Sequence, residues 1–172
     1  GGELMPVEVS MVDGSGRLTL TGRLGDVMKE SARTARTYCR ADADRLGIDA
    51  TNFDKLDFHV HIPGGAVPKE GATAGITVAT AMVSAITGRP VRRDTAMTGE
   101  ITLQGRVLRT RGIKEKVLAA HRAGIKRFVL PAGNERDLHD VPESARCGLE
   151  LAFAAHMSEV VDSALLAGES PG

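Results

Sequence analysis

The spacing of apolar and polar residues predicts three well-defined elements. Residues 57–62 alternate strictly between polar and apolar side chains, which is typical of a strand with one buried face. Residues 76–86 are apolar on almost every side, as in a helix enclosed by its neighbours. From about residue 25 to residue 46, apolar or small residues recur at helical spacing and predict a long amphipathic helix.

Weaker patterns complete the expected architecture. The turn at residues 13–16 predicts a β-hairpin, Gly105 predicts a second turn, and Asn134 is expected to cap a short helix through Leu138. Further strands are expected at 4–12, 17–21, 101–103, 107–108, 127–130 and 149–153, and further helices at 113–123 and 157–166. Interleaved strands and helices without a repeat or linker predict an α/β fold, loosely α+β, with mixed sheets and packed helices. We expect one domain over residues 1–167 and a disordered tail at 168–172.

Composition narrows the functional classes. Hydrophobic residues make up 42% of the 172 residues and aromatic residues only 3%, so we expect a core of small aliphatic side chains rather than stacked rings. The 22 basic and 22 acidic residues cancel without a basic block, which argues against a nucleic-acid surface. No apolar run is long enough to cross a membrane, and Cys39 and Cys147 are expected to be free thiols. The chain lacks an initiator methionine, so we expect it to be part of a longer protein.

Residues 68–75 form the most suggestive stretch, because a Gly/Pro-rich loop turns abruptly into the apolar helix. The first N–H groups of a helix lack partners within the helix and carry the positive end of its dipole, so they can stabilise an anion. Thr73 lies at this entrance. Its hydroxyl is either an ordinary helix cap or a nucleophile.

A hydroxyl nucleophile needs a base, and a neutral lysine can serve when burial disfavours its ammonium form. On the helix expected at 113–123, Lys116 falls on the apolar side beside Val117, whereas Lys114 falls on the polar side. Lys116 is therefore the better candidate base, the alternative being a lysine whose apolar stem lies along the helix surface.

The strand at 57–62 offers a second, less specific set of polar residues. Asp57, His59 and His61 share one face and resemble an incomplete metal site, although histidines that line a polar groove are the favoured interpretation. The chain also lacks the G-x-x-x-x-G-K-[ST] pattern with which a phosphate-binding loop holds ATP.

Taken together, five segments closely resemble the proteolytic domain of Lon, the ATP-dependent protease, over essentially the whole chain. The resemblance lies in residues 22–31, 59–63, 68–75, 97–103 and 114–122, in the order found in that family.

The resemblance implies a catalytic dyad of a hydroxyl nucleophile and a lysine. Lon-type enzymes use a serine and the second lysine of a Lys-Glu-Lys run, which correspond to Thr73 and Lys116 in this chain. Threonine keeps a hydroxyl, but its β-methyl restricts χ1 and crowds the approach to a carbonyl. Three further departures are Ala72 in place of the usual proline, Glu70 in place of the usual aspartate, and residues 111–113 in place of Gly-Gly-Leu.

The resemblance also implies supporting residues. Thr98 would orient the lysine, Glu70 takes the place of an aspartate near the active site, and the groove would be lined or supported by His59, His61 and Glu100. It implies no metal or other cofactor in this segment, with ATP and Mg expected on an AAA+ module outside it.

The function implied is that of the endopeptidase domain of an ATP-dependent protease that degrades unfolded or damaged polypeptides. The full-length protein would be a homo-hexamer in the bacterial cytoplasm rather than the mitochondrial matrix, without nucleic-acid or membrane partners. One alternative is a catalytically weak or silent Lon-like domain that serves assembly or substrate holding. Another is an unrelated nucleic-acid-binding α/β domain.

Overall fold

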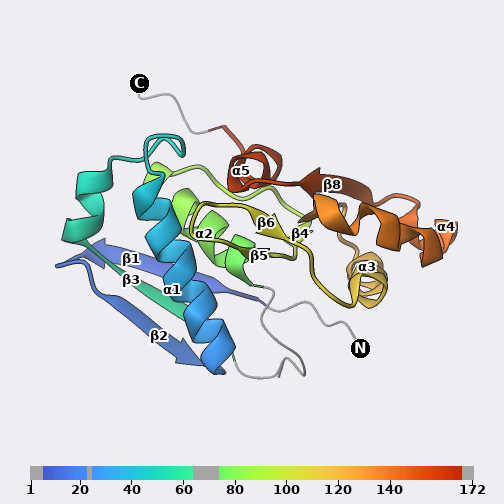
Figure 1. Cartoon of the computed structure of the whole chain (residues 1–172), viewed down its shortest axis with the longest axis horizontal. Coiled ribbons are helices and arrows are strands. Elements are labelled where there is room, and N and C mark those ends of the chain that lie inside the picture. The colour runs from blue at the N-terminus through green and yellow to red at the C-terminus, as the bar shows by residue number, and fades with distance from the viewer. Residues whose placement is uncertain (1–5, 23–24, 64–73, 168–172) are drawn as a thin grey trace.

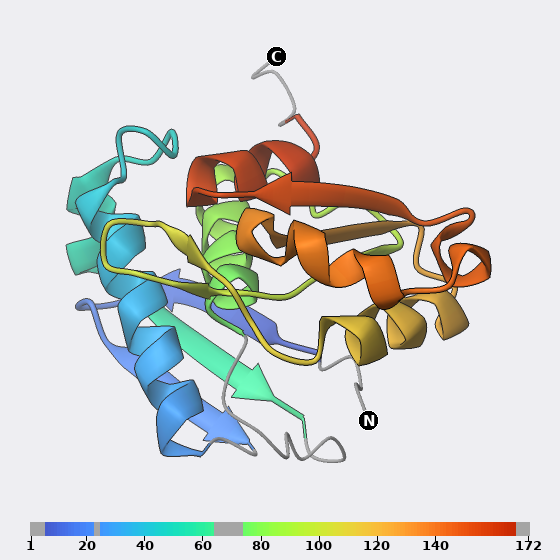
Figure 2. The same ribbon diagram turned by 45° about the vertical axis from the view of Figure 1, so that its right-hand side comes forward.

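The structure is a computed structural model that describes residues 6–22, 25–63 and 74–167. Figure 1 shows two sheets, one at each end of the molecule, with helices packed on them and between them. The same arrangement is visible after a 45° turn in Figure 2. Mixed sheets and packed helices confirm the α/β class expected from the sequence.

The first sheet places β3 in its centre and corrects the predicted β-hairpin. Its strands are β1 (Glu8–Asp13), β2 (Leu18–Gly22) and β3 (Leu56–Ile62), in the order β1-β3-β2. β3 runs antiparallel to β1 and parallel to β2, so the first two strands do not pair with each other. The turn between them crosses the beginning of β3, where Asp57 Oδ1 accepts the N–H groups of Ser15 (2.9 Å) and Arg17 (2.8 Å).

Two helices cover the inner face of this sheet, α1 (Asp26–Ala41) and α2 (Gly75–Thr87), and α5 (Met157–Ala164) packs on α2. The alternation in β3 is confirmed, because Phe58, Val60 and Ile62 are all buried beneath the helices. Full burial of a side chain of this kind contributes about 1.5–3 kcal/mol. The core contains many alanines, as expected, but its largest buried side chains include four rings, namely Tyr38, Phe53, Phe58 and Phe128. The expectation of a core without stacked rings was therefore only partly right, since Phe53 and Phe58 pack at a centroid distance of 5.8 Å.

Helix α1 ends at Ala41, five residues before the predicted end, and turns continue the chain to Gly47. Asp42 follows the last helical residue and accepts a hydrogen bond from the Tyr38 hydroxyl at 2.8 Å. Leu46 is nevertheless buried, so the apolar pattern outlasts the helix. Val27, one of the apolar residues in the helical pattern of residues 25–46, is 58% exposed and faces away from the core. A short 3-10 helix, η1 (Ala50–Lys55), then leads into β3.

The second sheet is parallel and has its own apolar cluster. It consists of β4 (Thr95–Met97), β7 (Arg127–Pro131) and β8 (Glu150–Ala154), with β7 in the centre. The connecting helices are α3 (Ile113–Arg122), the 3-10 helix η2 (Ala132–Asp140) and α4 (Glu143–Arg146). Asn134 lies inside η2 and does not cap it, which corrects the predicted cap, since Pro131 takes the capping position.

A small hairpin joins the two parts. β5 (Glu100–Ile101) and β6 (Val107–Leu108) pair antiparallel, and Gly105 makes the predicted turn with φ +85°. A side chain at Gly105 would collide with the ring of Tyr38, so glycine meets both a backbone and a packing requirement.

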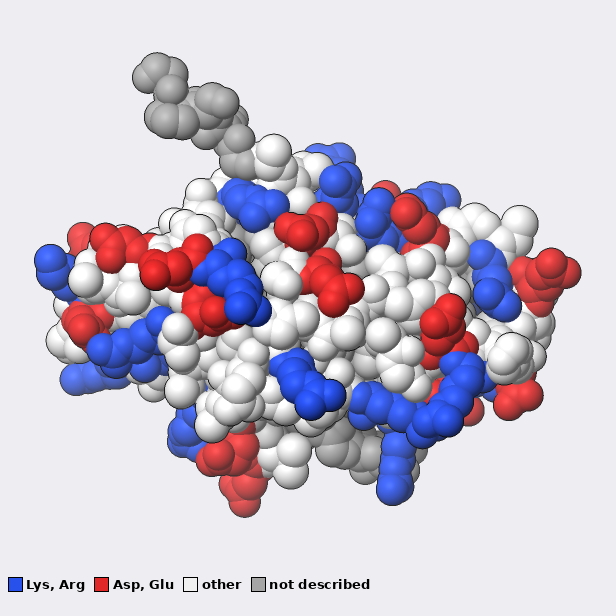
Figure 3. All heavy atoms as spheres, turned by 45° about the horizontal axis from the view of Figure 1, so that its top comes forward, with Lys and Arg blue, Asp and Glu red and all other residues white. Residues whose placement is uncertain are grey.

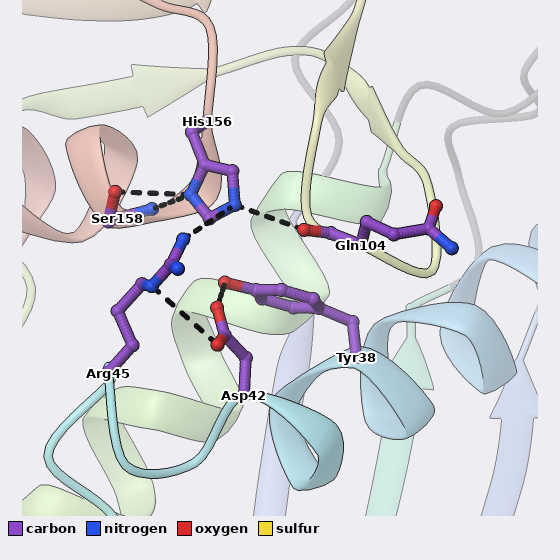
Figure 4. Close-up of polar contacts among 6 residues, drawn as sticks. All are labelled: Tyr38, Asp42, Arg45, Gln104, His156 and Ser158. Atoms are coloured by element: carbon purple, nitrogen blue, oxygen red, sulfur yellow. Dashed lines mark hydrogen bonds and ion pairs between the residues drawn. The ribbon is translucent and has the colours of Figure 1, made fainter.

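His156 fastens this hairpin to α5 (Figure 4). Its Nδ1 accepts the N–H of Ser158 at 3.1 Å, which caps α5, and its Nε2 lies 3.0 Å from the Gln104 carbonyl oxygen. These two partners favour the neutral tautomer with the proton on Nε2. Arg45 lies beside the same ring and 3.7 Å from Asp42, so the cluster serves to dock the hairpin.

Candidate active site

The predicted nucleophile and its acidic neighbour cannot be placed. Thr73 and Glu70 lie outside the described residues, and the description resumes at Ala74, immediately before α2. The described part of the candidate site consists of the start of α2 and the residues that hold it.

The segment 98–100 holds the first turn of α2. The N–H of Ile76 donates to the carbonyl oxygen of Gly99 at 3.1 Å, which gives one of the free helix-start donors a partner. Thr98 directly follows β4, and its N–H donates to the carbonyl oxygen of Val129 at 3.0 Å. The end of the second sheet thus fixes the start of the helix that follows residue 73.

Glu100 links α1 to the same helix start. Its Oε2 accepts the Ser31 hydroxyl at 2.6 Å, and its Oε1 lies beside the backbone of Gly75 and Ile101. Burial raises the pKa of this carboxyl above its ordinary value, and the contacts with Ser31, Ile101 and Gly75 lower it by less. A side chain at Gly75 would collide with the carboxyl, so glycine allows the close approach.

Thr98 carries a second feature that suits an active site. It is 3% exposed, and its hydroxyl has no hydrogen-bond partner among the described residues. Buried hydroxyls without a hydrogen-bond partner are uncommon in folded proteins. The resemblance assigned Thr98 to orienting the lysine, and a hydroxyl with free bonding capacity is compatible with that role.

The lysine prediction agrees with the structure as far as burial goes. Lys116 is partly buried in the first turns of α3, whereas Lys114 is exposed. Ile113 and Val117 pack into the second apolar cluster on the same side of the helix. Helical spacing therefore predicted the relative burial of the two lysines correctly.

His59 and His61 share a partner that the sequence did not indicate. The Thr21 hydroxyl lies 2.6 Å from His59 Nε2 and 2.7 Å from His61 Nδ1, and the two rings meet edge to face. A single hydroxyl proton can be donated to only one ring, so the other ring must donate to the Thr21 oxygen. Both histidines lie on the face of β3 that points away from the helices.

Asp57 does not join these histidines in a metal site. Its carboxylate holds the turn after β1, and the hydrogen bonds from Arg17 and Ser15 hold its pKa below the ordinary value. Among residues 6–22, 25–63 and 74–167, no group of three or more His, Cys, Asp or Glu side chains is arranged to hold a metal ion.

Sequence reasoning missed two partners in this region, Ser31 and Thr21. Ser31 is one of the small residues in the helical pattern of residues 25–46 and is 5% exposed, and a buried serine needs a hydrogen-bond partner. That requirement is a usable signal, but it does not name the partner. Thr21 gave no signal, because an outward threonine is ordinary in a strand.

The surface and the open groove do not suggest a different site. Figure 3 shows basic and acidic side chains interspersed over most of one face of the molecule, with a few basic side chains adjoining at its lower right. A groove of about 610 Å³ beside η2 is lined by Arg136, His139, Arg146 and Phe153 among others, and includes none of the predicted site residues. No helix in the described part of the chain has the length and apolar character needed to span a membrane.

Comparison with known proteins supplies the family. The model of the Lon protease (S16) C-terminal proteolytic domain matches residues 1–167. Lon protease from Anaeromyxobacter dehalogenans is 59% identical over 165 residues, which cover 96% of this chain and 20% of that protein. Lon protease 1 from Bacillus subtilis is 54% identical over 166 residues, and Lon protease 2 from Thermus thermophilus is 55% identical over 168 residues. These matches cover 96% and 98% of this chain, and 21% of each relative. The chain therefore spans about a fifth of the length of its relatives, and it belongs to the family of Lon protease C-terminal proteolytic domains.

Proposed function

We propose that this chain is the endopeptidase domain of an ATP-dependent Lon-type protease. The observation that carries the proposal is the family match across residues 1–167, which spans both the hydroxyl at Thr73 and the amine at Lys116. The anchored start of α2 at Gly75, two residues after Thr73, supports it.

The proposed reaction begins with the Thr73 hydroxyl. Its oxygen attacks the scissile carbonyl carbon while its proton passes to the neutral amine of Lys116. The tetrahedral oxyanion would be stabilised by N–H groups at the loop-to-helix junction, where the dipole of α2 also favours negative charge. Lys116 then gives the proton to the leaving amine as the peptide C–N bond breaks, which leaves an ester on Thr73.

Water completes the cycle. Lys116, neutral again, accepts a proton from the attacking water, and the second tetrahedral intermediate collapses with breakage of the ester bond. The proton returns to the Thr73 oxygen, and the acid product leaves. No other reactant is required.

Glu100, Ser31 and Thr98 would help to hold the Thr73 hydroxyl and the Lys116 amine in position for reaction. Glu100 and Ser31 hold the start of α2, and Thr98 supplies a buried hydroxyl beside it. In the same proposal His59 and His61 line or support the substrate groove, with Thr21 fixing their rings. Glu70 would take the role of the acidic residue that the family has near the active site.

For the whole protein we infer the domain organisation and assembly that the family resemblance implies. An AAA+ module outside this segment would bind ATP and Mg and deliver unfolded or damaged polypeptides to a homo-hexamer. The bacterial source of the matched Lon proteases favours the cytoplasm. We propose neither a nucleic-acid nor a membrane partner for this domain.

The second candidate is a silent Lon-like domain, and the observation that favours it is the threonine at position 73. Its β-methyl restricts the rotamers from which the oxygen can attack. Hydrolysis of a fluorogenic peptide by the wild type, Thr73→Ala, Thr73→Ser and Lys116→Ala separates the two. The proposal expects activity that Thr73→Ala and Lys116→Ala both abolish; activity confined to Thr73→Ser supports the silent domain, and wild-type rates in Thr73→Ala refute the dyad.

A further inference from the structure

The segment that enters α3 is held by a side chain. β6 ends at Leu108 and α3 begins at Ile113, so the intervening residues belong to no strand or helix. Asn134 Oδ1 accepts the N–H of Thr110 at 2.9 Å, and Asn134 Nδ2 donates to the Thr110 carbonyl oxygen at 2.8 Å. This closed pair of bonds imitates the pairing of a neighbouring strand and fixes both the position and the direction of the backbone.

A charged pair fixes the orientation of the amide. The second Nδ2 hydrogen of Asn134 donates to Asp137 Oδ2 at 2.7 Å, and Asp137 Oδ1 pairs with Arg109 Nη2 at 3.0 Å. The bonds from Asn134 and Arg109 hold the pKa of Asp137 below its ordinary value, so this carboxylate acts only as an acceptor. Asn134 is 0% exposed and uses its oxygen and both amide hydrogens. A flipped amide would lose all three bonds.

The held segment leads directly to Lys116. Gly112, two residues after Thr110, adopts φ +71°, and its carbonyl oxygen accepts the N–H of Lys116 at 3.1 Å. This is the first backbone bond of α3. The apolar contacts of Ile113 and Val117 set the rotation of the helix. The two hydrogen bonds between Asn134 and Thr110, which we call the Asn134 clamp, set where the helix begins.

We propose that Asn134 is a positioning residue for the proposed catalytic base Lys116, with Asp137 orienting its amide. The inference rests on the proposed function, because it gives the clamp a role in proton transfer. A displacement on the order of 1 Å at a reacting group can cost about 100-fold in rate, so a loosened helix entry has a kinetic signature.

The test compares Asn134→Ala with a matched variant of the same region, Val141→Ala. Val141 is a buried apolar residue directly after η2 and belongs to the apolar cluster of α3, but it makes no bond to Thr110. At a temperature where circular dichroism shows both variants folded, we expect Asn134→Ala to lower kcat for a peptide about 10-fold or more with little change in KM. Val141→Ala should keep kcat within about twofold.

Two further readouts separate positioning from general loosening. The acid limb of the kcat–pH profile should shift in Asn134→Ala and stay in place in Val141→Ala, because only the former moves the proposed base. Asn134→Asp keeps an acceptor for the Thr110 N–H but sets a second acceptor against the Thr110 carbonyl oxygen and Asp137, so it should lower kcat at least as much as Asn134→Ala. If Asn134→Ala does not fold, Asp137→Ala removes the orienting acceptor at a less buried position and should lower kcat about threefold.

The outcomes keep the two proposals apart. Hydrolysis that requires Thr73 and Lys116, with Asn134→Ala (or its substitute) equal to Val141→Ala in kcat, KM and pH profile, overturns this inference and leaves the proposed function standing. Hydrolysis that survives Thr73→Ala and Lys116→Ala overturns the proposed function. Absence of hydrolysis from both the wild type and Thr73→Ser removes both.

Discussion

The bond between Ser31 and Glu100 gives the most direct test of how the helix start is held. Ser31 is 5% exposed, and its hydroxyl donates to the partly buried carboxyl at 2.6 Å. A hydrogen bond to a charged group contributes about 1.5–3 kcal/mol, and a carboxyl that keeps some contact with water belongs at the lower end. We expect Ser31→Ala to lower the free energy of unfolding by about 1.5–2 kcal/mol at neutral pH, out of a typical total of about 5–15 kcal/mol.

The pH dependence of this loss is the sharper part of the prediction. Burial raises the folded-state pKa of Glu100 above its ordinary value of 4.5, so folding disfavours the ionised carboxyl. The stability that Glu100 contributes through its raised pKa is fully present below the ordinary pKa, and it is lost as pH rises through the folded-state pKa. Because the Ser31 hydroxyl lowers that pKa, Ser31→Ala raises it further and deepens the loss on the alkaline side. Below about pH 4.5 the effect should shrink to that of a neutral bond, about 0.5–1 kcal/mol.

Urea unfolding between pH 4 and pH 8 measures both quantities. Ser84→Ala is the matched control, since the Ser84 hydroxyl donates at the same 2.6 Å to a neutral acceptor, the Arg89 carbonyl oxygen. Its effect should not vary with pH. In a double-mutant cycle, Ser31→Ala should cost only the value of a neutral bond, about 0.5–1 kcal/mol, once Glu100→Gln has removed the charge. A loss for Ser31→Ala that is the same at every pH, or unaltered by Glu100→Gln, contradicts the reasoning.

Two further predictions concern backbone geometry and thiol chemistry. Gly105→Ala should destabilise the fold by about 2–4 kcal/mol in urea unfolding, because positive φ and collision with Tyr38 act together. Gly124→Ala has a similar φ of +75° and open space around it, so its cost should be about 1 kcal/mol; equal costs for the two contradict the collision. Burial raises the pKa of the Cys39 thiol to about 12, so a disulfide reagent should modify exposed Cys147 rapidly and Cys39 only on unfolding. Rapid reaction of both thiols in the folded protein refutes this.

Local pattern was sufficient wherever burial follows a simple period. The alternation in residues 57–62 and the apolar run at 76–86 identified β3 and α2, since side chains two apart on a strand share a face and an enclosed helix is apolar all round. Helical spacing also placed Lys116 on the more buried side of α3 and Lys114 outside. Gly105 was recognised as a turn because few other residues accept its backbone conformation.

Contacts between distant parts of the chain could not be predicted from the local spacing of apolar and polar residues. The expected hairpin of β1 and β2 failed because β3, which follows more than 30 residues later, lies between them. Asn134 has the chemistry of a cap, but its partner is Thr110 in another element, and the spacing of residues around it does not reveal this. The same holds for Ser31 and Glu100, which are 69 residues apart.

The sequence by itself therefore determined the class of the fold, its periodic elements and, through family resemblance, the residues of the proposed dyad. The tertiary structure decided the strand order, the anchoring of α2 by Gly99 and Glu100, and the Asn134 clamp before α3. The physical reason is that the spacing of apolar residues follows from local backbone geometry. A buried polar group requires a hydrogen-bond partner, but the sequence around it does not identify that partner. Which partner it finds depends on how the whole chain packs.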